Sequence, residues 1–115
     1  MPCPGVVTGR VVLPDEDYGQ IQQSVDRGHN LWRLSPVRTA QVVGSAHLGL
    51  SPQDTYSFVE QYLDAGSGLQ NAVVRVRHES CTYLVQLFQP ERQGPRGIWV
   101  VSEVTELGNY HHQSI

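Results

Sequence analysis

The chain has 115 residues, a net charge of −3 and 17% charged residues, and all eight of its basic residues are arginine. This length suffices for a single domain with a buried core. The acidic balance argues against nucleic acid and against an anionic membrane surface as partners, and no apolar run reaches the roughly 18 residues of a membrane span.

We expect one domain, 1–115, with four parts in chain order. An N-terminal arm at 1–17 precedes a helical part at 18–48. An antiparallel sheet at 55–107 follows, and a flexible tail at 108–115 ends the chain. Such tails order only when something holds them down.

The arm contains an apolar, branched run at 5–13, which is typical of either an edge strand or an extended segment. Cys3 lies before this run, and the second cysteine is Cys81. Two cysteines are too few for a disulfide framework. A single bridge between them would fit an exported protein, but two unpaired thiols are the favoured expectation.

Two helices are expected in the helical part. Residues 18–27 follow three acidic side chains, which suit the positive end of a helix dipole. Residues 36–48 have a stronger start signal, with Ser35 as N-cap and Pro36 at the first helical position. Gly49 stands where a left-handed C-cap is required.

Residues 55–63 fit both a helix and a strand. Ser51 and Asp54 form a helix-start pattern just before this segment, and apolar pairs lie four residues apart within it. However, its Tyr, Phe, Val and Thr residues all favour strands. We favour a strand, which would widen the sheet.

The clearest pattern is three β-rich runs at 72–79, 82–89 and 98–107. The first alternates apolar and polar residues, as a half-buried strand does. The short connections suit an antiparallel meander. Together with 55–63, these runs predict an α+β fold in which one or two helices pack on a four-stranded antiparallel sheet.

The last strand places Trp99 on the opposite face from Ile98 and Val100. We expect an aliphatic face to receive the helix at 36–48. The other face would combine arginines with Trp99, which packs under the N-terminal arm or under the connector around Trp32. We expect function on this second face.

Several segments resemble small uncharacterised domains of exported proteins or lipoproteins of Gram-positive bacteria. They are 28–29 (Gly-His), 32–36 (Trp-Arg-Leu-Ser-Pro), 75–78, 83–87 with 89–90, and 94–101, the last with Gly-Ile-Trp-Val-Val. The resemblance implies a fold loosely like cystatin or PepSY-type domains and a place in the cell envelope. No activity is assigned to such domains, so no site residues follow. Ser35, where Asp is usual, and 79–80, where Gly is, depart from the pattern.

The candidate binding residues are aromatic and arginine side chains, which dominate interface hot spots. They are Trp32, Arg33, Arg38, Arg75, Arg77 and Trp99. A structural alternative stays open. Trp32 would then cap the sheet edge, Arg33 and Arg38 would pair with Asp26 or with glutamates, and the strand arginines would be solvated charges that blunt edge pairing.

Signals for chemistry are weak. The five histidines lack the paired spacing of a zinc site. His78 is close to Ser80 and Cys81, but a turn is expected between them and no nucleophile elbow is present. We therefore predict no catalytic residue, metal or cofactor.

The leading hypothesis is a non-enzymatic binding or accessory domain of a bacterial cell-envelope protein. It would contact a protein or an anionic polymer through one sheet face, and a homodimer stays open. The alternatives are a small-ligand carrier, with a pocket lined by Trp99, Tyr83 and Phe88, or an NTF2-like enzyme with His78 in that pocket.

Overall fold

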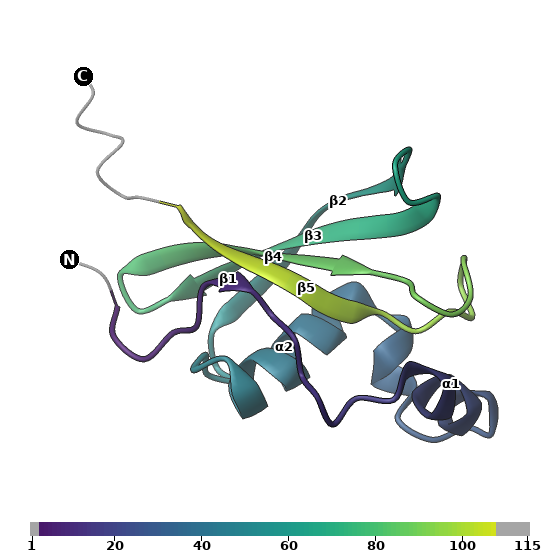
Figure 1. The fold of residues 1–115 in the computed structure, drawn as a ribbon. Coiled ribbons are helices and arrows are strands. Elements are labelled where there is room, and N and C mark those ends of the chain that lie inside the picture. The colour runs from purple at the N-terminus through teal and green to yellow at the C-terminus, as the bar shows by residue number, and fades with distance from the viewer. Residues whose placement is uncertain (1–2, 108–115) are drawn as a thin grey trace.

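The structure is a computed structural model that describes residues 3–107. These residues form an antiparallel sheet with helices on one side and at one end (Figure 1). The expected tail, 108–115, lies outside the described residues. The helices are α1 (Tyr18–Asp26), the 3-10 helix η1 (Leu31–Leu34) and α2 (Pro36–His47); the strands are β1 (Gly9–Arg10), β2 (Thr55–Asp64), β3 (Leu69–His78), β4 (Cys81–Phe88) and β5 (Val100–Leu107).

The sheet has the strand order β1-β5-β4-β3-β2, and every neighbouring pair is antiparallel. The predicted α+β class and antiparallel sheet are therefore confirmed. The sheet described here has five strands, whereas four were predicted, because part of the arm joins it. Gly9 and Arg10 pair with Val104 and Glu103 of β5.

Both expected helices are present, and their ends follow the sequence signals. The Asp17 carboxylate accepts the Gln20 N–H at 3.1 Å, and the Ser35 hydroxyl accepts the Arg38 N–H at 3.2 Å. Gly49 has a left-handed φ of 81° just after α2. None of the described helices is long and apolar enough to cross a membrane.

The segment 55–63 belongs to strand β2, as favoured, although a helix-start pattern precedes it. That pattern closes a turn instead. The Asp54 carboxylate accepts the Ser51 N–H at 2.8 Å, and the Ser51 hydroxyl accepts the Gln53 N–H at 3.2 Å. The capping bonds therefore form without a helix, because the residues that follow are strand formers that pair with β3.

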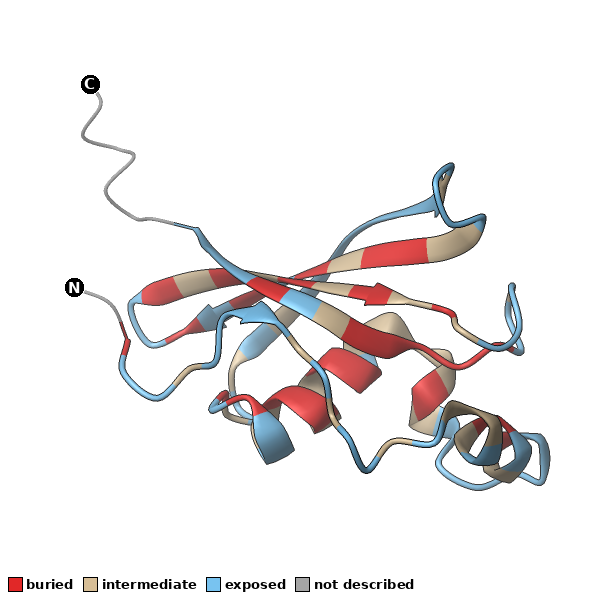
Figure 2. Ribbon diagram, viewed as in Figure 1, coloured by how far each residue is buried: buried red, intermediate tan, exposed pale blue. Residues whose placement is uncertain are grey.

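The main core lies between α2 and one face of the sheet (Figures 1 and 2). Alternate residues of β3 and β4 fill it from the sheet side, and Ala40 and Val43 fill it from α2. A bulge shifts the register of β5 against β4, so that Val101 and Val104, three residues apart, both lie in this core.

Trp99 also lies in this main core and is 3% exposed. The aliphatic face of β3 receives α2 as predicted, but the prediction for Trp99 was wrong, because Trp99 is on the face that α2 covers and not on the face of the arginines. Ile98 and Val100 instead join a second, smaller cluster with Val25 of α1. Trp99 does contact the connector, since its backbone N–H donates to the Arg33 carbonyl at 2.9 Å and Trp32 packs against the same core.

Cys3 and Cys81 form a disulfide, with their Cα atoms 6.2 Å apart. The expectation of two unpaired thiols was wrong. The arm runs back beside the end of α2, where the Val7 N–H donates to the Leu48 carbonyl at 2.9 Å. This path brings Cys3 to the start of β4, which sequence alone could not place.

Candidate functional site

The six residues proposed for binding do not form one patch. Trp99 and Arg33 are buried, at 3% and 7% exposed. Trp32 is partly exposed in a pocket, and Arg38 is exposed on α2. Arg75 and Arg77 are exposed on the sheet face opposite α2, and they alone remain adjacent. The candidate surface therefore consists of these two arginines and the residues that surround them on the sheet.

Arg33 has a structural role. Its Nη2 atom lies 2.6 Å from Glu16 Oε2, and its Nη1 atom donates to the Trp99 carbonyl at 3.2 Å. Its guanidinium also lies 4.7 Å from the centre of the Trp32 ring. One buried cation thus joins the arm, η1 and the segment before β5. The alternative in which Arg33 pairs with an acid is correct, and the acid is Glu16.

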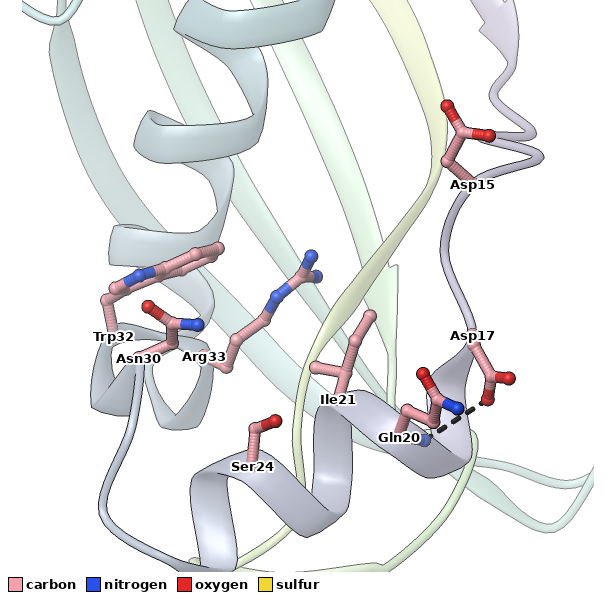
Figure 3. A pocket seen from close by; sticks show the side chains of 8 residues that line it. All are labelled: Asp15, Asp17, Gln20, Ile21, Ser24, Asn30, Trp32 and Arg33. Atoms are coloured by element: carbon pink, nitrogen blue, oxygen red, sulfur yellow. Dashed lines mark hydrogen bonds between the residues drawn. The ribbon is translucent and has the colours of Figure 1, made fainter.

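The Trp32 pocket has a volume of about 230 Å³ between the arm, α1 and η1 (Figure 3). Because Arg33 is already matched by Glu16, the carboxylates of Asp15 and Asp17 leave the pocket anionic. It therefore suits a small cationic group better than an anionic polymer. The lining side chains are Asp15, Asp17, Gln20, Ile21, Ser24, Asn30, Trp32 and Arg33.

The arginine face consists of Arg75, Arg77 and their neighbours across the strands, on the side of the sheet away from α2. Arg75 pairs with Ser57 of β2 and Leu84 of β4. Arg77 pairs with Thr55 and Thr82 in the next row. Only small side chains on β2 therefore separate the two guanidinium groups from the outer edge of the sheet.

Strand β2 forms that outer edge, and most of its length is exposed (Figure 2). Four large apolar side chains protrude from it, and we call them the apolar edge: Phe58 (52% exposed), Val59 (42%), Tyr62 (36%) and Leu63 (61%). A register shift between Phe58 and Glu60 marks a bulge at Val59. The sequence reasoning missed this surface, because a strand with apolar residues at both odd and even positions is usually buried on both faces.

His78, the residue considered for catalysis, lies in a polar cross-link at the end of β3. Its Nδ1 atom is 2.6 Å from Asp54 Oδ2, and its Nε2 atom is 3.7 Å from Glu79 Oε2. Glu79 opens the tight β3–β4 turn with a left-handed φ of 55°. His78 is 8% exposed and lines neither the Trp32 pocket nor the second pocket described below.

Tyr56 lies beside this cross-link at the start of β2. Its hydroxyl donates to the Ser51 carbonyl at 2.9 Å. Burial, with a smaller contribution from the Asp54 carboxylate, raises the pKa of Tyr56 to about 12. The phenol is thus neutral at physiological pH, and it acts as a hydrogen-bond donor that holds the turn against the sheet.

Within residues 3–107, no three His, Cys, Asp or Glu side chains are grouped to hold a metal ion. Comparison with protein-family models, curated proteins and solved structures finds no match to this chain. A function must therefore be argued from the apolar edge, the arginine face and the pockets themselves.

Proposed function

We propose that this protein is a non-enzymatic binding module that receives an extended segment of a partner protein along the outer edge of β2. The observation that carries the proposal is the apolar edge. Edge strands normally carry charges, prolines or a covering element, because free backbone N–H and C=O groups would otherwise pair with other chains. Here a ten-residue edge strand exposes four large apolar side chains and one charged residue, Glu60.

Strand addition gives the partner both affinity and selectivity. The main chain of the added strand pairs with the free groups of β2, and alternate side chains contact its two faces. On one face, Arg75 and Arg77 lie one strand behind Ser57 and Thr55, so that their long side chains can reach over these small residues. A segment with acidic side chains on that face and apolar side chains beside Phe58 and Leu63 fits best.

The bulge at Val59 limits how such a strand can pair. It divides β2 into two shorter regular segments, which lowers the tendency of flat edges to stack without limit. A partner would thus add across a short stretch, and side-chain contacts would contribute much of the specificity.

The same proposal includes an extracytoplasmic location and kinship with exported domains of the cystatin or PepSY type. The buried Cys3–Cys81 disulfide supports the location, because such bonds form and persist in oxidising compartments. A single helix laid across an antiparallel sheet is compatible with the kinship.

The test uses the full chain, labelled with ¹⁵N, and two synthetic decapeptides in which valine alternates with glutamate or with lysine. We expect the glutamate peptide to shift amide resonances of β2 and β3 and to bind at least tenfold more tightly than the lysine peptide. The paired substitutions Arg75→Gln and Arg77→Gln should remove most of this preference.

A matched pair of variants separates the edge from general surface charge. Leu63→Lys adds a charge to the apolar edge, and Val12→Lys adds the same charge to the arm, where Val12 is 78% exposed. Only Leu63→Lys should weaken binding. Equal weakening by both variants, or shifts outside β2 and β3, would refute strand addition at this edge.

A further inference from the structure

The loop between β4 and β5 is organised by a buried side chain. Gln89 is fully buried. Its amide donates to the carbonyls of Gly94 at 2.8 Å and Gly97 at 3.0 Å, and its carbonyl accepts the Gly94 N–H at 2.7 Å. A Cβ on Gly97 would lie 1.7 Å from the Arg92 carbonyl oxygen, so that only glycine allows this path. The loop therefore has a defined shape without regular secondary structure.

A second buried glutamine fixes the same loop to α1. Gln22 is 5% exposed. Its amide donates to the Arg96 carbonyl at 2.9 Å, and its carbonyl accepts the Ile98 N–H at 3.1 Å. Burying two polar side chains is costly unless their hydrogen bonds are formed, and here most of those bonds go to the loop backbone. Loops held rigidly by a scaffold are common carriers of binding residues.

This arrangement forms one wall of an open pocket of about 390 Å³ between α1, η1 and the loop. Val25, which is 5% exposed, and Leu34 supply its apolar side chains. Its charged side chains are Asp26, Arg92 and Arg96, so that the lining residues carry one more positive than negative charge. The size is within the range of small-molecule sites.

Asp26 is occupied by Arg92 in a two-pronged ion pair. Its carboxylate oxygens lie 2.8 and 2.9 Å from the two Arg92 nitrogens. The hydrogen bonds from Arg92 also hold the pKa of the Asp26 carboxyl below its usual value. The surplus positive charge of the pocket therefore belongs to Arg96.

We propose that this pocket binds a carboxylate attached to a short apolar group. The planar guanidinium of Arg96 offers paired N–H donors that match the two oxygens of a carboxylate. The apolar group of the ligand would pack against Val25 and Leu34. Either a free medium-chain acid or an apolar residue at the carboxyl terminus of a peptide has this chemistry. The site shares no residue with the apolar edge and does not depend on the proposed function.

The test follows ¹⁵N-labelled full-length protein during titration with hexanoate at constant ionic strength. We expect shifts confined to the amides around 25–26, 34 and 91–98. N-acetyl-leucine represents the peptide terminus, hexylamine reverses the charge, and inorganic phosphate supplies charge without an apolar group. Binding of hexanoate, N-acetyl-leucine or both upholds the site and identifies its source, whereas hexylamine and phosphate should give no comparable shifts.

Substitutions of arginine decide which side chain is responsible. Arg96→Gln should weaken hexanoate binding at least tenfold, and it keeps the backbone carbonyl that Gln22 holds. Arg96→Lys keeps the positive charge but loses the paired N–H donors of the guanidinium. Its affinity for hexanoate should therefore lie between those of the unchanged protein and of Arg96→Gln. Arg27→Gln, at the exposed end of α1 and outside the pocket, is the control. The assignment would be overturned if Arg27→Gln weakened hexanoate binding as much as Arg96→Gln does. It would also be overturned if phosphate bound as tightly as hexanoate.

Discussion

The two edges of the sheet are constructed differently. At one edge, β1 pairs with β5, and the arm that contains β1 is bonded to β4 through Cys3 and Cys81. At the other edge, β2 has no further neighbour among the described residues, and it exposes the apolar edge. One edge of the sheet is thus a two-residue strand held by a disulfide-bonded arm, whereas the other is an exposed ten-residue strand. This contrast is why we place partner binding at β2.

The largest expected effect is the loss of stability when the disulfide that holds the arm is removed. The chain-entropy relation for a bridge spanning 78 residues predicts a loss of about 4.5 kcal/mol in the free energy of unfolding. Urea denaturation of the Cys3→Ser, Cys81→Ala variant measures it. A loss below about 1 kcal/mol would mean that pairing with β5 and packing on α2 hold the arm without the bridge.

A pair of glycine substitutions compares the stability of the two regions, one position against the arm and one in the turn that follows β2. Gly49 and Gly68 both have left-handed φ values, 81° and 74°. A Cβ on Gly49 would lie 1.9 Å from the Gly5 carbonyl oxygen of the arm, whereas Gly68, in the β2–β3 turn, has open space. Gly68→Ala should cost about 1 kcal/mol from backbone strain alone, and Gly49→Ala about 3 kcal/mol because the arm must also move. If thermal unfolding shows the same loss of stability for both variants, the arm can move away from residue 49 at little energetic cost.

Introducing lysine on the exposed strand β2 and on β5, which β1 covers, gives the sharpest local contrast. Leu63→Lys on β2 should change the free energy of unfolding by less than about 0.5 kcal/mol, because the side chain is already in water. Val104→Lys on β5, where the residue is 1% exposed, buries a charge and should cost more than about 3 kcal/mol. A large loss at position 63 would show that β2 is covered in solution, for instance by a second copy.

The smallest effect concerns Tyr56, where the exposed strand β2 begins. Because burial raises its pKa to about 12, from about 10 in an unfolded chain, the neutral phenol stabilises the fold below pH 10. This contribution is lost as the pH rises from 10 towards 12. Absorbance titration at 295 nm should lose its most basic tyrosine step in Tyr56→Phe. An unchanged curve would refute the assignment.

Much of the fold could be predicted from local signals. The caps at Ser35 and Gly49 and the alternation along β3 are short-range patterns, and their predictions were confirmed. The errors concerned long-range placement. That α2 covers the aliphatic face of β3 was predicted correctly. On which side of the sheet Trp99 would lie, and where the arm would run, depend on contacts between distant residues, and both the burial of Trp99 and the disulfide followed from them.

The candidate sites were less predictable than the fold. The exposure of Arg75 and Arg77 on one strand face was predicted from strand alternation. The apolar edge was not predicted, because no single segment of the sequence determines which strand lies at the edge of a sheet. The pocket beside Arg96 was also missed. Its signal was the pair Gln22 and Gln89, which resemble ordinary surface glutamines until the loop folds around them.

The pairing of β1 with β5 also has a consequence for the order of assembly. Gly9 and Arg10 must wait for residues 103–104, and Cys3 must wait for Cys81, so that the earliest part of the described chain completes its contacts last. Contacts of such long sequence separation form slowly. Until the arm docks, the outer side of β5 has no partner and the Cys3–Cys81 bond has not formed. A protein that matures in this order exposes strand edges until a late step, and that step joins two thiols into a disulfide by giving two electrons to an oxidant.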